Sequence, residues 1–378
     1  MARVLVVHNR YRVEGGEERS VELQLRAMRR AGVPHRLLER RSAQAGRGRA
    51  ALSLLRGGHR PEDVARAARE LGATVVHVHN MQPLVGPRGI AAARSAGARV
   101  VLHMHNLRLF CAIGVAARDG GPCFRCHGRN TLPGLVLNCR GSLPEAAAYA
   151  AALSAHQPRV FENVDRFLAP SGWAAGQLAR LGVPAERIEV LSHYLPAEAV
   201  AERSAADRAA HALVASRLSP EKGLEAAIEA ASDAGVPLMV AGEGPDRDRL
   251  ERRALQLGAP VTFLGRVRRD EVARLLRGAG ALLLPSRYHE FSPYAVLEAM
   301  AAGVPVLGAA VGGVPELIGA ERVLPRGDTP ALTRRLRDLW ADPARRRAEG
   351  EALLARVHRN HSEERFIERL LALYRAVS

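Results

Sequence analysis

Two series of short β-branched runs, separated by helical stretches, constrain the fold of this chain more than any other feature. In the first half the runs occupy residues 3–8, 74–79, 98–105, 166–170 and 187–191. In the second half they begin at residue 210 and read "AHALVASRL", "PLMVAGEG", "VTFLGRV", "ALLLPS" and "VPVLGAA". Helical patterns lie between them, for example at residues 17–32 and 170–182, where Gly182 is suited to follow a helix end. This alternation predicts an α/β fold with two largely parallel sheets.

The boundary between the two series lies in residues 192–210, which have no strand pattern. A length of 378 residues also exceeds what one core ordinarily serves. We therefore expect a domain over residues 1–192 and a second over 193–361, with a last helix at about 362–378 able to pack back on the first. Ligands of open parallel sheets bind at the carboxyl ends of the strands, so motifs that follow strands are the candidates for a site.

The charge of the chain restricts its partners. Its 55 Lys and Arg against 39 Asp and Glu give a net charge of +16, which suits nucleotides, phospholipid surfaces or nucleic acid. Aromatic residues make up only 4%, too few for the base-stacking platforms of a single-strand nucleic-acid binder. The N-terminus has no signal-peptide pattern and no apolar run is long enough for a membrane span, so we expect a cytoplasmic protein.

The only lysine of the chain, Lys222, lies in "RLSPEKGL" after the first strand of the second half. A cation near a helix start opposes the positive end of the helix dipole, unless an anion is shared between the cation and the helix amides. Arg217 leaves the same connection. The motif therefore predicts a phosphate site, with a solvated loop lysine as the alternative. The "GEG" turn and "FLGRV" also follow strands, but each is a weak signal alone.

The strongest motif is "YHEFSPYAVLEAM", in which Ser292 fits an N-cap and Pro293 the first helical position. Glu290 then lies just before the helix and Glu298 lies inside it. Carboxylates at this spacing suit hydroxyl groups on two parts of one ligand, with a phosphate at the helix start between them. Glu298 could instead face solvent, but its neighbours are apolar, so we expect it to be buried with a partner.

Together these stretches resemble the retaining glycosyltransferases of family 4, which have the GT-B fold: two Rossmann-like domains that face each other across a cleft. The resemblance covers the second half, through Arg217, Lys222, "GEGP", "FLGRV", the Glu290–Glu298 pair and "GGVPELI". It implies that the second domain binds a nucleotide diphosphate-sugar donor. In that family the Arg and the Lys bind the diphosphate, the second Glu holds the ribose and the first Glu contacts the transferred sugar.

The chain departs from the family pattern at Ser292–Pro293, where the family commonly has Phe-Gly. Proline has no backbone N–H that could bind a phosphate. The amides of Tyr294 and Ala295 could serve instead. The residues expected at the donor are Gly15, Gly16, Gly242, Gly244, Arg266, Val267, Ser292, Tyr294, Ala295 and Glu298.

Two motifs follow strands of the first half. "NRYRVEGGEERS" is not the dinucleotide G-x-G-x-x-G, so a nicotinamide enzyme gains no support, but Gly15–Gly16 permits a close approach to a ligand. The family has a glycine-rich loop here, and an ordinary flexible loop is the alternative.

His103 and His105 share a face of the strand at residues 98–105, with His105 nearer its carboxyl end. The resemblance places His105 near the donor sugar, with a catalytic role beside Arg217, Lys222 and Glu290.

All four cysteines, Cys111, Cys123, Cys126 and Cys139, fall in one loop-rich stretch. Disulfides are not expected in a cytoplasmic protein, and the haem-attachment spacing of "CFRCH" would require export. One C-x2-C flanked by two single cysteines can close a structural zinc site, with free buried thiols as the alternative, and His127 leaves the ligand count open. The stretch resembles a subgroup of family 4 that acts in surface-polysaccharide or secondary-metabolite assembly.

We therefore predict a retaining glycosyltransferase that moves a sugar from a nucleotide diphosphate donor to an acceptor hydroxyl and needs no cofactor for catalysis. A catalytically silent nucleotide-sugar binder and a basic nucleic-acid-binding protein are the rivals. Between residues 40 and 60, six arginines and no acid surround the cluster Leu52–Leu55. This stretch could touch anionic lipid at the inner membrane surface, where a lipid-linked acceptor would reside, or form a solvated loop.

Overall fold

The computed structural model describes residues 2–11 and 15–378, apart from the side chain of Arg47. Residues 12–14 of the predicted glycine-rich loop lie outside the described residues. The chain divides into two compact units: Met1–Arg118, Cys123–Ser192 and Glu364–Ser378 form the first, and Asp119–Pro122 and His193–Glu363 form the second. No helix in the described ranges combines the length and the apolar character that a membrane crossing requires.

The first unit is built on a six-stranded sheet with the order β2-β1-β3-β4-β7-β8 and parallel pairing throughout. Its strands are β1 Val4–Arg10, β2 His35–Arg41, β3 Val75–Val78, β4 Arg99–His103, β7 Arg166–Ala169 and β8 Ile188–Val190. The sequence predicted five of these strands and missed β2. The residues of β2, "HRLLERR", are mostly polar, as an edge strand with no fully buried residue allows.

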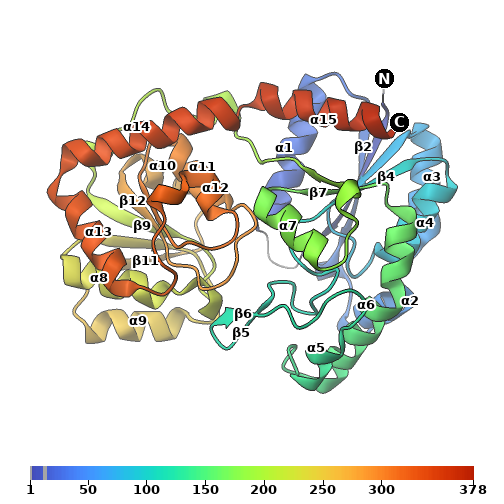
Figure 1. Ribbon diagram of the computed structural model, residues 1–378, viewed down its shortest axis with the longest axis horizontal. Coiled ribbons are helices and arrows are strands. Elements are labelled where there is room, and N and C mark those ends of the chain that lie inside the picture. Colours follow the sequence, from blue (N-terminus) through green and yellow to red (C-terminus); the bar gives the residue numbers. More distant parts are fainter. Residues whose placement is uncertain (1, 12–14) are drawn as a thin grey trace. The chain divides into compact units, whose positions relative to one another are not determined.

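Eight helices of the described chain accompany this sheet (Figure 1). They are α1 Gly16–Arg30, α2 Arg47–Arg56, α3 Pro61–Leu71, α4 Gly86–Ser95, α5 Leu132–Val136, α6 Leu143–Asn163, α7 Gly172–Arg180 and α15 Glu363–Val377. Gly182 follows the end of α7 with a φ of +111°, as predicted. At the end of the chain α15 lies beside α1, where Gln24 Nε2 donates to the Tyr374 hydroxyl at 3.0 Å.

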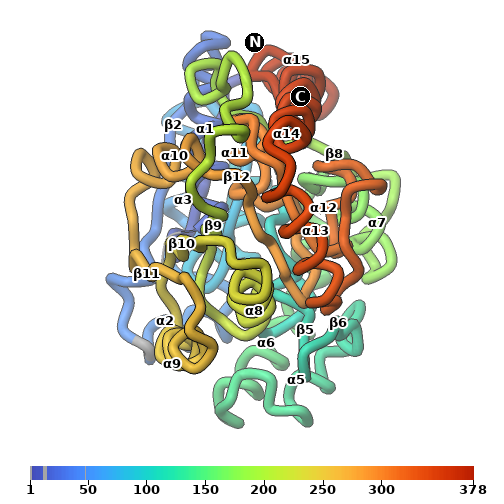
Figure 2. The backbone as a smooth tube through the Cα atoms, turned by 90° about the vertical axis from the view of Figure 1, so that its left-hand side faces the viewer, coloured from blue at the N-terminus to red at the C-terminus, as the bar shows by residue number. Residues whose placement is uncertain are grey.

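The second unit contains a five-stranded parallel sheet with the order β11-β10-β9-β12-β13 (Figure 2). Its strands are β9 His211–Ala215, β10 Leu238–Ala241, β11 Val261–Gly265, β12 Ala279–Leu284 and β13 Val306–Gly308. Its helices are α8 Leu224–Ala234, α9 Arg247–Gln256, α10 Arg269–Arg277, α11 Tyr294–Ala301, α12 Val314–Ile318, α13 Thr329–Ala341 and α14 Pro343–Asn360. All five strands occur where the sequence predicts them.

The strand order of the second unit determines where a ligand can bind. From β9 the chain passes to β10 and β11 on one side of the sheet, and then returns to β12 and β13 on the other side. The loops that leave β9 and β12 therefore diverge at the carboxyl edge of the sheet, which is where open parallel sheets form a ligand-binding crevice. The motifs that contain Lys222 and Glu290 are those two loops.

Candidate functional site

A buried ion pair joins the two loops that diverge at the carboxyl edge of the second unit. Lys222 ends a short 3-10 turn after β9, just before α8, and its Nζ lies 2.8 Å from Glu290 Oε1. Glu290 lies in the loop between β12 and α11, and its side chain is 7% exposed, against 16% for Lys222. Sequence reasoning assigned both residues to a ligand, but did not anticipate that they bind each other.

Two hydroxyl groups complete the polar network around the Glu290 carboxylate. Ser286 Oγ donates to Oε1 at 2.7 Å, and the Tyr288 hydroxyl donates to Oε2 at 3.1 Å. Lys222 Nζ also donates to the Tyr288 hydroxyl at 3.0 Å. Charge-assisted hydrogen bonds of this kind hold the carboxylate in one orientation, so Glu290 presents fixed acceptor oxygens at the crevice.

Electrostatics keep Lys222 protonated in this network. Burial by itself lowers the pKa of its ammonium, but the attraction of Glu290 and Tyr288 outweighs burial and holds the pKa above its ordinary value. Burial, followed by the nearby Glu290 charge, raises the pKa of Tyr288 to about 12. At neutral pH Tyr288 is therefore a neutral hydroxyl, while Lys222 carries its full charge.

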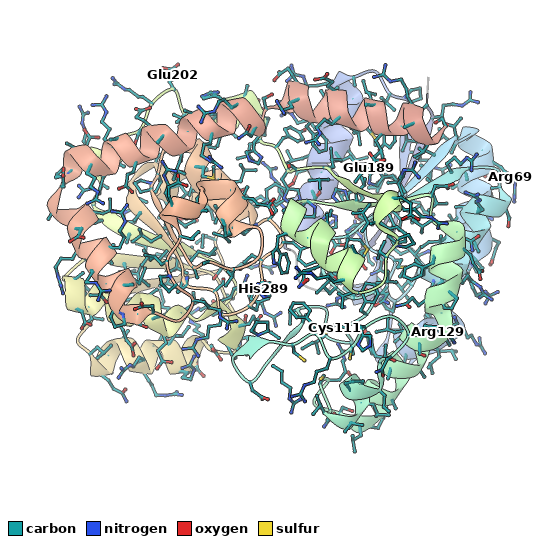
Figure 3. All side chains as sticks on the ribbon, viewed as in Figure 1. Arg69, Cys111, Arg129, Glu189, Glu202 and His289 are labelled. Carbon is teal, nitrogen blue, oxygen red and sulfur yellow. The ribbon has the colours of Figure 1, made fainter. Side chains whose placement is uncertain are left out.

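The backbone of Glu290 is fixed by the glycines of "VGGVPELI". Gly313 N donates to the Glu290 carbonyl oxygen at 2.8 Å, and Gly312 N donates to His289 Nδ1 at 3.0 Å (His289 is labelled in Figure 3). Gly312 has a φ of +59°, and a Cβ there would collide with the Glu290 carbonyl oxygen. Position 312 therefore requires glycine because two loops meet backbone to backbone.

The predicted donor glycines Gly242 and Gly244 make a similar contact. A Cβ at Gly242 would collide with the Ser216 carbonyl oxygen, and one at Gly244 with the carbonyl oxygen of Leu218. Leu218 N also donates to the Glu243 carbonyl at 3.0 Å. The "GEG" turn thus packs on the loop that leads to Lys222, which accounts for both glycines without any ligand.

Helix α11 begins one residue later than predicted. Its N-cap is Pro293 and not Ser292, and Ser292 makes no side-chain cap because the extended backbone of Pro293 already leads into the first turn at Tyr294. Tyr294 is buried and stacks on His193 with ring centroids 4.2 Å apart, and Ala295 is half-buried behind it. Glu298 is half-buried on α11, so it is less buried than the sequence predicted.

The remaining predicted cations lie at the rim of the crevice. Arg217 follows β9 and Arg266 follows β11, and both side chains are exposed, whereas Val267 is half-buried. Across residues 2–11 and 15–378 neither guanidinium has an ion-pair or hydrogen-bond partner. The carboxyl edge of this sheet therefore carries two exposed cations in addition to Lys222.

In the first unit His105 is held by a histidine that the sequence reasoning passed over. His79 follows β3, and its Nδ1 lies 2.9 Å from His105 Nε2, with the two rings stacked 5.2 Å apart. Burial holds the pKa of His79 well below its ordinary value, so His79 is neutral. The alternation "HVH" at residues 77–79, which places two histidines on one face, could have revealed it.

The same edge contains further buried polar groups. Burial, with the nearby Glu18 charge, raises the pKa of Glu17 to about 8. Glu17 lines a small pocket together with His79, His103 and His105. Gly15 is the N-cap of α1, and Gly16 is the first residue of the helix. The Gly15 amide donates to Glu18 Oε2 at 2.7 Å, so the helix itself uses that amide.

Ring nitrogens of His77, His79 and His103 lie within 4.8 Å of one another and could hold a metal ion.

The four cysteines are free thiols that line one small pocket in the first unit (Cys111 is labelled in Figure 3). Among the described residues, no three of their sulfur atoms lie within 4.8 Å of one another. The loop therefore gathers the thiols around one space without forming a closed tetrahedral cluster.

The Lys222–Glu290 pair makes a prediction about stability. Lys222→Met leaves a buried carboxylate without its cation, so we expect a loss of roughly 3–5 kcal/mol in unfolding free energy. Glu290→Gln in the same background should restore much of it, because Ser286 and Tyr288 can still bond the amide. The measurement is urea unfolding of both single variants and the double variant. The exposed pair Arg36–Glu70, 2.8 Å apart, serves as the control, where Met and Gln replacements should cost less than about 1 kcal/mol. Equal, additive losses at both pairs would contradict the coupling.

Comparisons with known proteins match both units to one family. Residues 198–353 match the model of glycosyl transferases group 1, and residues 14–193 match the glycosyl transferase 4-like domain. The D-inositol 3-phosphate glycosyltransferase 1 of Catenulispora acidiphila is 32% identical over 327 residues, which are 80% of this chain and 72% of that protein. A GDP-mannose-dependent monoacylated alpha-(1-6)-phosphatidylinositol monomannoside mannosyltransferase of Corynebacterium glutamicum is 33% identical over 168 residues, 41% of this chain.

Coverage of the curated relatives varies. The matched stretches span only 29%, 34% and 44% of the lengths of relatives from Methanocaldococcus jannaschii, Streptomyces fradiae and C. glutamicum. Two solved structures are similar over almost their whole length. Sucrose-phosphate synthase from Thermosynechococcus elongatus has a TM-score of 0.75 at 18% identity, with 99% of this chain and 98% of that chain covered. Anabaena Alr3699/HepE in complex with UDP and glucose has a TM-score of 0.71 at 16% identity, with 99% and 100% covered. With its two parallel sheets, this chain has the GT-B fold and belongs to glycosyltransferase family 4.

Proposed function

We propose that this protein transfers a sugar from a nucleoside diphosphate-sugar to an acceptor hydroxyl, with retention of the anomeric configuration and without a catalytic metal. The observation that supports it most is the buried Lys222–Glu290 pair at the crevice between the loops of β9 and β12. In this proposal residues 193–361 form the donor domain, and residues 1–192 with the last helix form the acceptor side. Family membership supports the reaction class.

Lys222 binds the donor diphosphate in this proposal. An ammonium has three protons, and two of them are used by Glu290 and Tyr288, so the third can reach a phosphate oxygen. Arg217, which is exposed and unpaired within the described chain, adds a second cation at the same edge. As the sugar–phosphate bond breaks, negative charge grows on the leaving diphosphate, and these two cations stabilise it.

The compact ammonium also explains why this position is a lysine in an arginine-rich chain. Lys222 must satisfy a carboxylate and a phenol behind it while it contacts a phosphate in front of it. Three rotatable donors around a single nitrogen can do this, whereas a planar guanidinium fixes its donors in one fork. The amides of Tyr294 and Ala295 at the start of α11 supply the remaining phosphate contacts at the positive end of that helix.

The two carboxylates have separate tasks in the proposal. Three hydrogen-bond donors of its own unit hold Glu290 in place. Its remaining lone pairs accept hydrogen bonds from hydroxyl groups of the transferred sugar. Glu298, on the half-buried side of α11, binds the ribose hydroxyls of the nucleotide. Gly242, Gly244, Arg266 and Val267 shape the base and ribose side of the crevice.

On the acceptor side, His105 is oriented by its hydrogen bond to His79. The contact between His105 and the transferred sugar, which the family resemblance implies, is part of the proposal, as are the donor contacts of Gly15 and Gly16. A catalytically silent binder would bind the same donor but release no nucleoside diphosphate. A nucleic-acid-binding protein would instead show steep salt dependence with oligonucleotides.

The donor proposal makes a prediction that separates the two glutamates. Glu298→Gln should weaken the binding of the free nucleoside diphosphate about tenfold, because the amide is a poorer acceptor for two ribose hydroxyls. Glu290→Gln should lower turnover far more than it weakens that affinity, because its sugar contact exists only with the intact donor and the amide oxygen can still accept from Lys222. The measurement is calorimetric titration with UDP, GDP and ADP, followed by nucleotide release from the matching sugar donor.

Arg268→Ala is the matched control, because Arg268 is exposed near Arg266 and is already paired with Asp270. It should bind and turn over like the wild type. Equal losses of diphosphate affinity in the two glutamate variants would show that the roles are assigned wrongly. Tight binding of a donor with no nucleotide release in the wild type would favour the silent binder.

We further propose a lipid-linked acceptor and a peripheral contact with anionic lipid at the cytoplasmic face of a membrane. Helix α2 exposes Leu52 and Leu55, at 47% and 46%, and the exposed Arg49 and Arg56 lie on the same helix. Leucines beside arginines, without acids, suit the boundary between lipid headgroups and acyl chains. The C. glutamicum relative is named for a phosphatidylinositol mannoside acceptor, which supports this proposal.

The lipid contact predicts a specific loss of vesicle binding. The wild type should sediment with phosphatidylglycerol vesicles and not with phosphatidylcholine vesicles, because the helix is basic. Leu52→Ser with Leu55→Ser should reduce sedimentation severalfold, whereas Leu255→Ser, at a leucine of α9 that is even more exposed, should not. Binding that is unchanged in the double variant would contradict a role for α2.

A further inference from the structure

We propose that Cys111, Cys123, Cys126 and Cys139 bind one Zn²⁺ ion that stabilises residues 104–142, a structural role outside the reaction proposed above. Between β4 and α6 this segment contains only the strands β5 Ala117–Arg118 and β6 Gly121–Pro122 and the five-residue α5. A connection of this length with so little regular structure is uncommon inside a compact unit. A metal ion would supply the cross-links that regular structure does not.

The position of the thiols supports four sulfur ligands. Cys111 comes from the start of the segment, Cys123 and Cys126 from its middle and Cys139 from its end, yet all four line the same small pocket. His127, the other candidate ligand, is exposed and does not line the cavity, and its Nδ1 lies 3.2 Å from the Arg125 carbonyl oxygen. The structure therefore favours Cys₄ over a site that includes the histidine.

The surroundings of the sulfur atoms suit thiolates. The backbone amides of Ala116, Ile113 and Gly114 are directed at the Cys111 sulfur. The Arg118 guanidinium lies 3.8 Å from Cys139 Sγ. Four thiolates on Zn²⁺ carry a net charge of −2, so donors and a cation of this kind are the partners that such a cluster needs.

Burial opposes thiolates when no metal ion is bound. Zn²⁺ removes the conflict because it displaces the thiol protons and neutralises the sulfur charges, so binding should release protons.

Closing the site requires the thiols to move toward one another. Zinc–sulfur bonds of about 2.3 Å place the sulfur atoms about 3.8 Å apart, closer than the spread of the thiols around this cavity. Backbone hydrogen bonds already fix the ligand-bearing turns: Cys123 N donates to the Ala116 carbonyl at 2.7 Å, and Cys139 N donates to the Gly134 carbonyl at 3.1 Å. Rotation of the thiols into the cavity would complete the tetrahedron.

The test is the metal content and the cobalt spectrum of the full chain. Protein from zinc-supplemented cells should contain about one equivalent of zinc by elemental analysis. After exchange, one equivalent of Co²⁺ should give the thiolate-to-cobalt charge-transfer band and the strong visible bands of tetrahedral sulfur coordination. Cys126→Ser should lose the stoichiometric metal and melt at a lower temperature, whereas His127→Ala should keep the wild-type spectrum and metal content.

Two outcomes would overturn the proposal. Metal-free wild type without a cobalt spectrum would do so, whether its thiols prove free or joined as disulfides by mass spectrometry. A His127→Ala variant that loses the metal like Cys126→Ser would replace Cys₄ by a site that contains the histidine. Neither outcome depends on whether a serine variant folds, because the first is measured on the wild type and the second on a surface histidine. Nucleotide binding should survive brief EDTA treatment in every case, so a failure here is distinct from a failure of the proposed reaction.

Discussion

The ion pair between Lys222 and Glu290 is the interaction on which the candidate site depends. The two residues come from loops on opposite sides of the point where the strand order reverses, so their 2.8 Å contact ties together chain segments 68 residues apart. Burial of either charge alone is costly, and each therefore requires the other. The pair also brings a cation and fixed acceptor oxygens to the same crevice, which is what recognition of a sugar phosphate requires.

Backbone contacts between loops keep that pair in place. Gly312 lets the loop after β13 touch the Glu290 carbonyl, and Gly242 and Gly244 let the "GEG" turn pack on the loop that leads to Lys222. These contacts leave no room for a Cβ, so the backbones of neighbouring loops at the carboxyl edge pack directly against each other. Glycines that resemble a ligand-binding motif therefore act first as packing residues, and any contact with the donor comes in addition.

Sequence patterns were sufficient for the sheets, because buried parallel strands read as apolar runs at regular spacing. They failed for β2, whose edge position allows polar letters, and for the cap of α11, where one residue of difference depends on the φ and ψ of Pro293. Lys222 and Glu290 were found as single residues, but their pairing and the role of Tyr288 depend on how distant loops meet. The His79–His105 hydrogen bond was missed for the same reason.

The single lysine allows the most direct test of the central claim. In protein labelled biosynthetically with ¹³C-lysine, only Lys222 gives a side-chain Cε signal. We predict that this signal keeps the shift of a charged ammonium as the pH rises past the ordinary lysine pKa of about 10.4, because Glu290 stabilises the charged form. In Glu290→Gln the midpoint should fall, since burial is then opposed by Tyr288 without the Glu290 charge, and a bound nucleoside diphosphate should move the wild-type signal. An unperturbed midpoint in both proteins, together with no change on addition of UDP, GDP or ADP, would contradict the account.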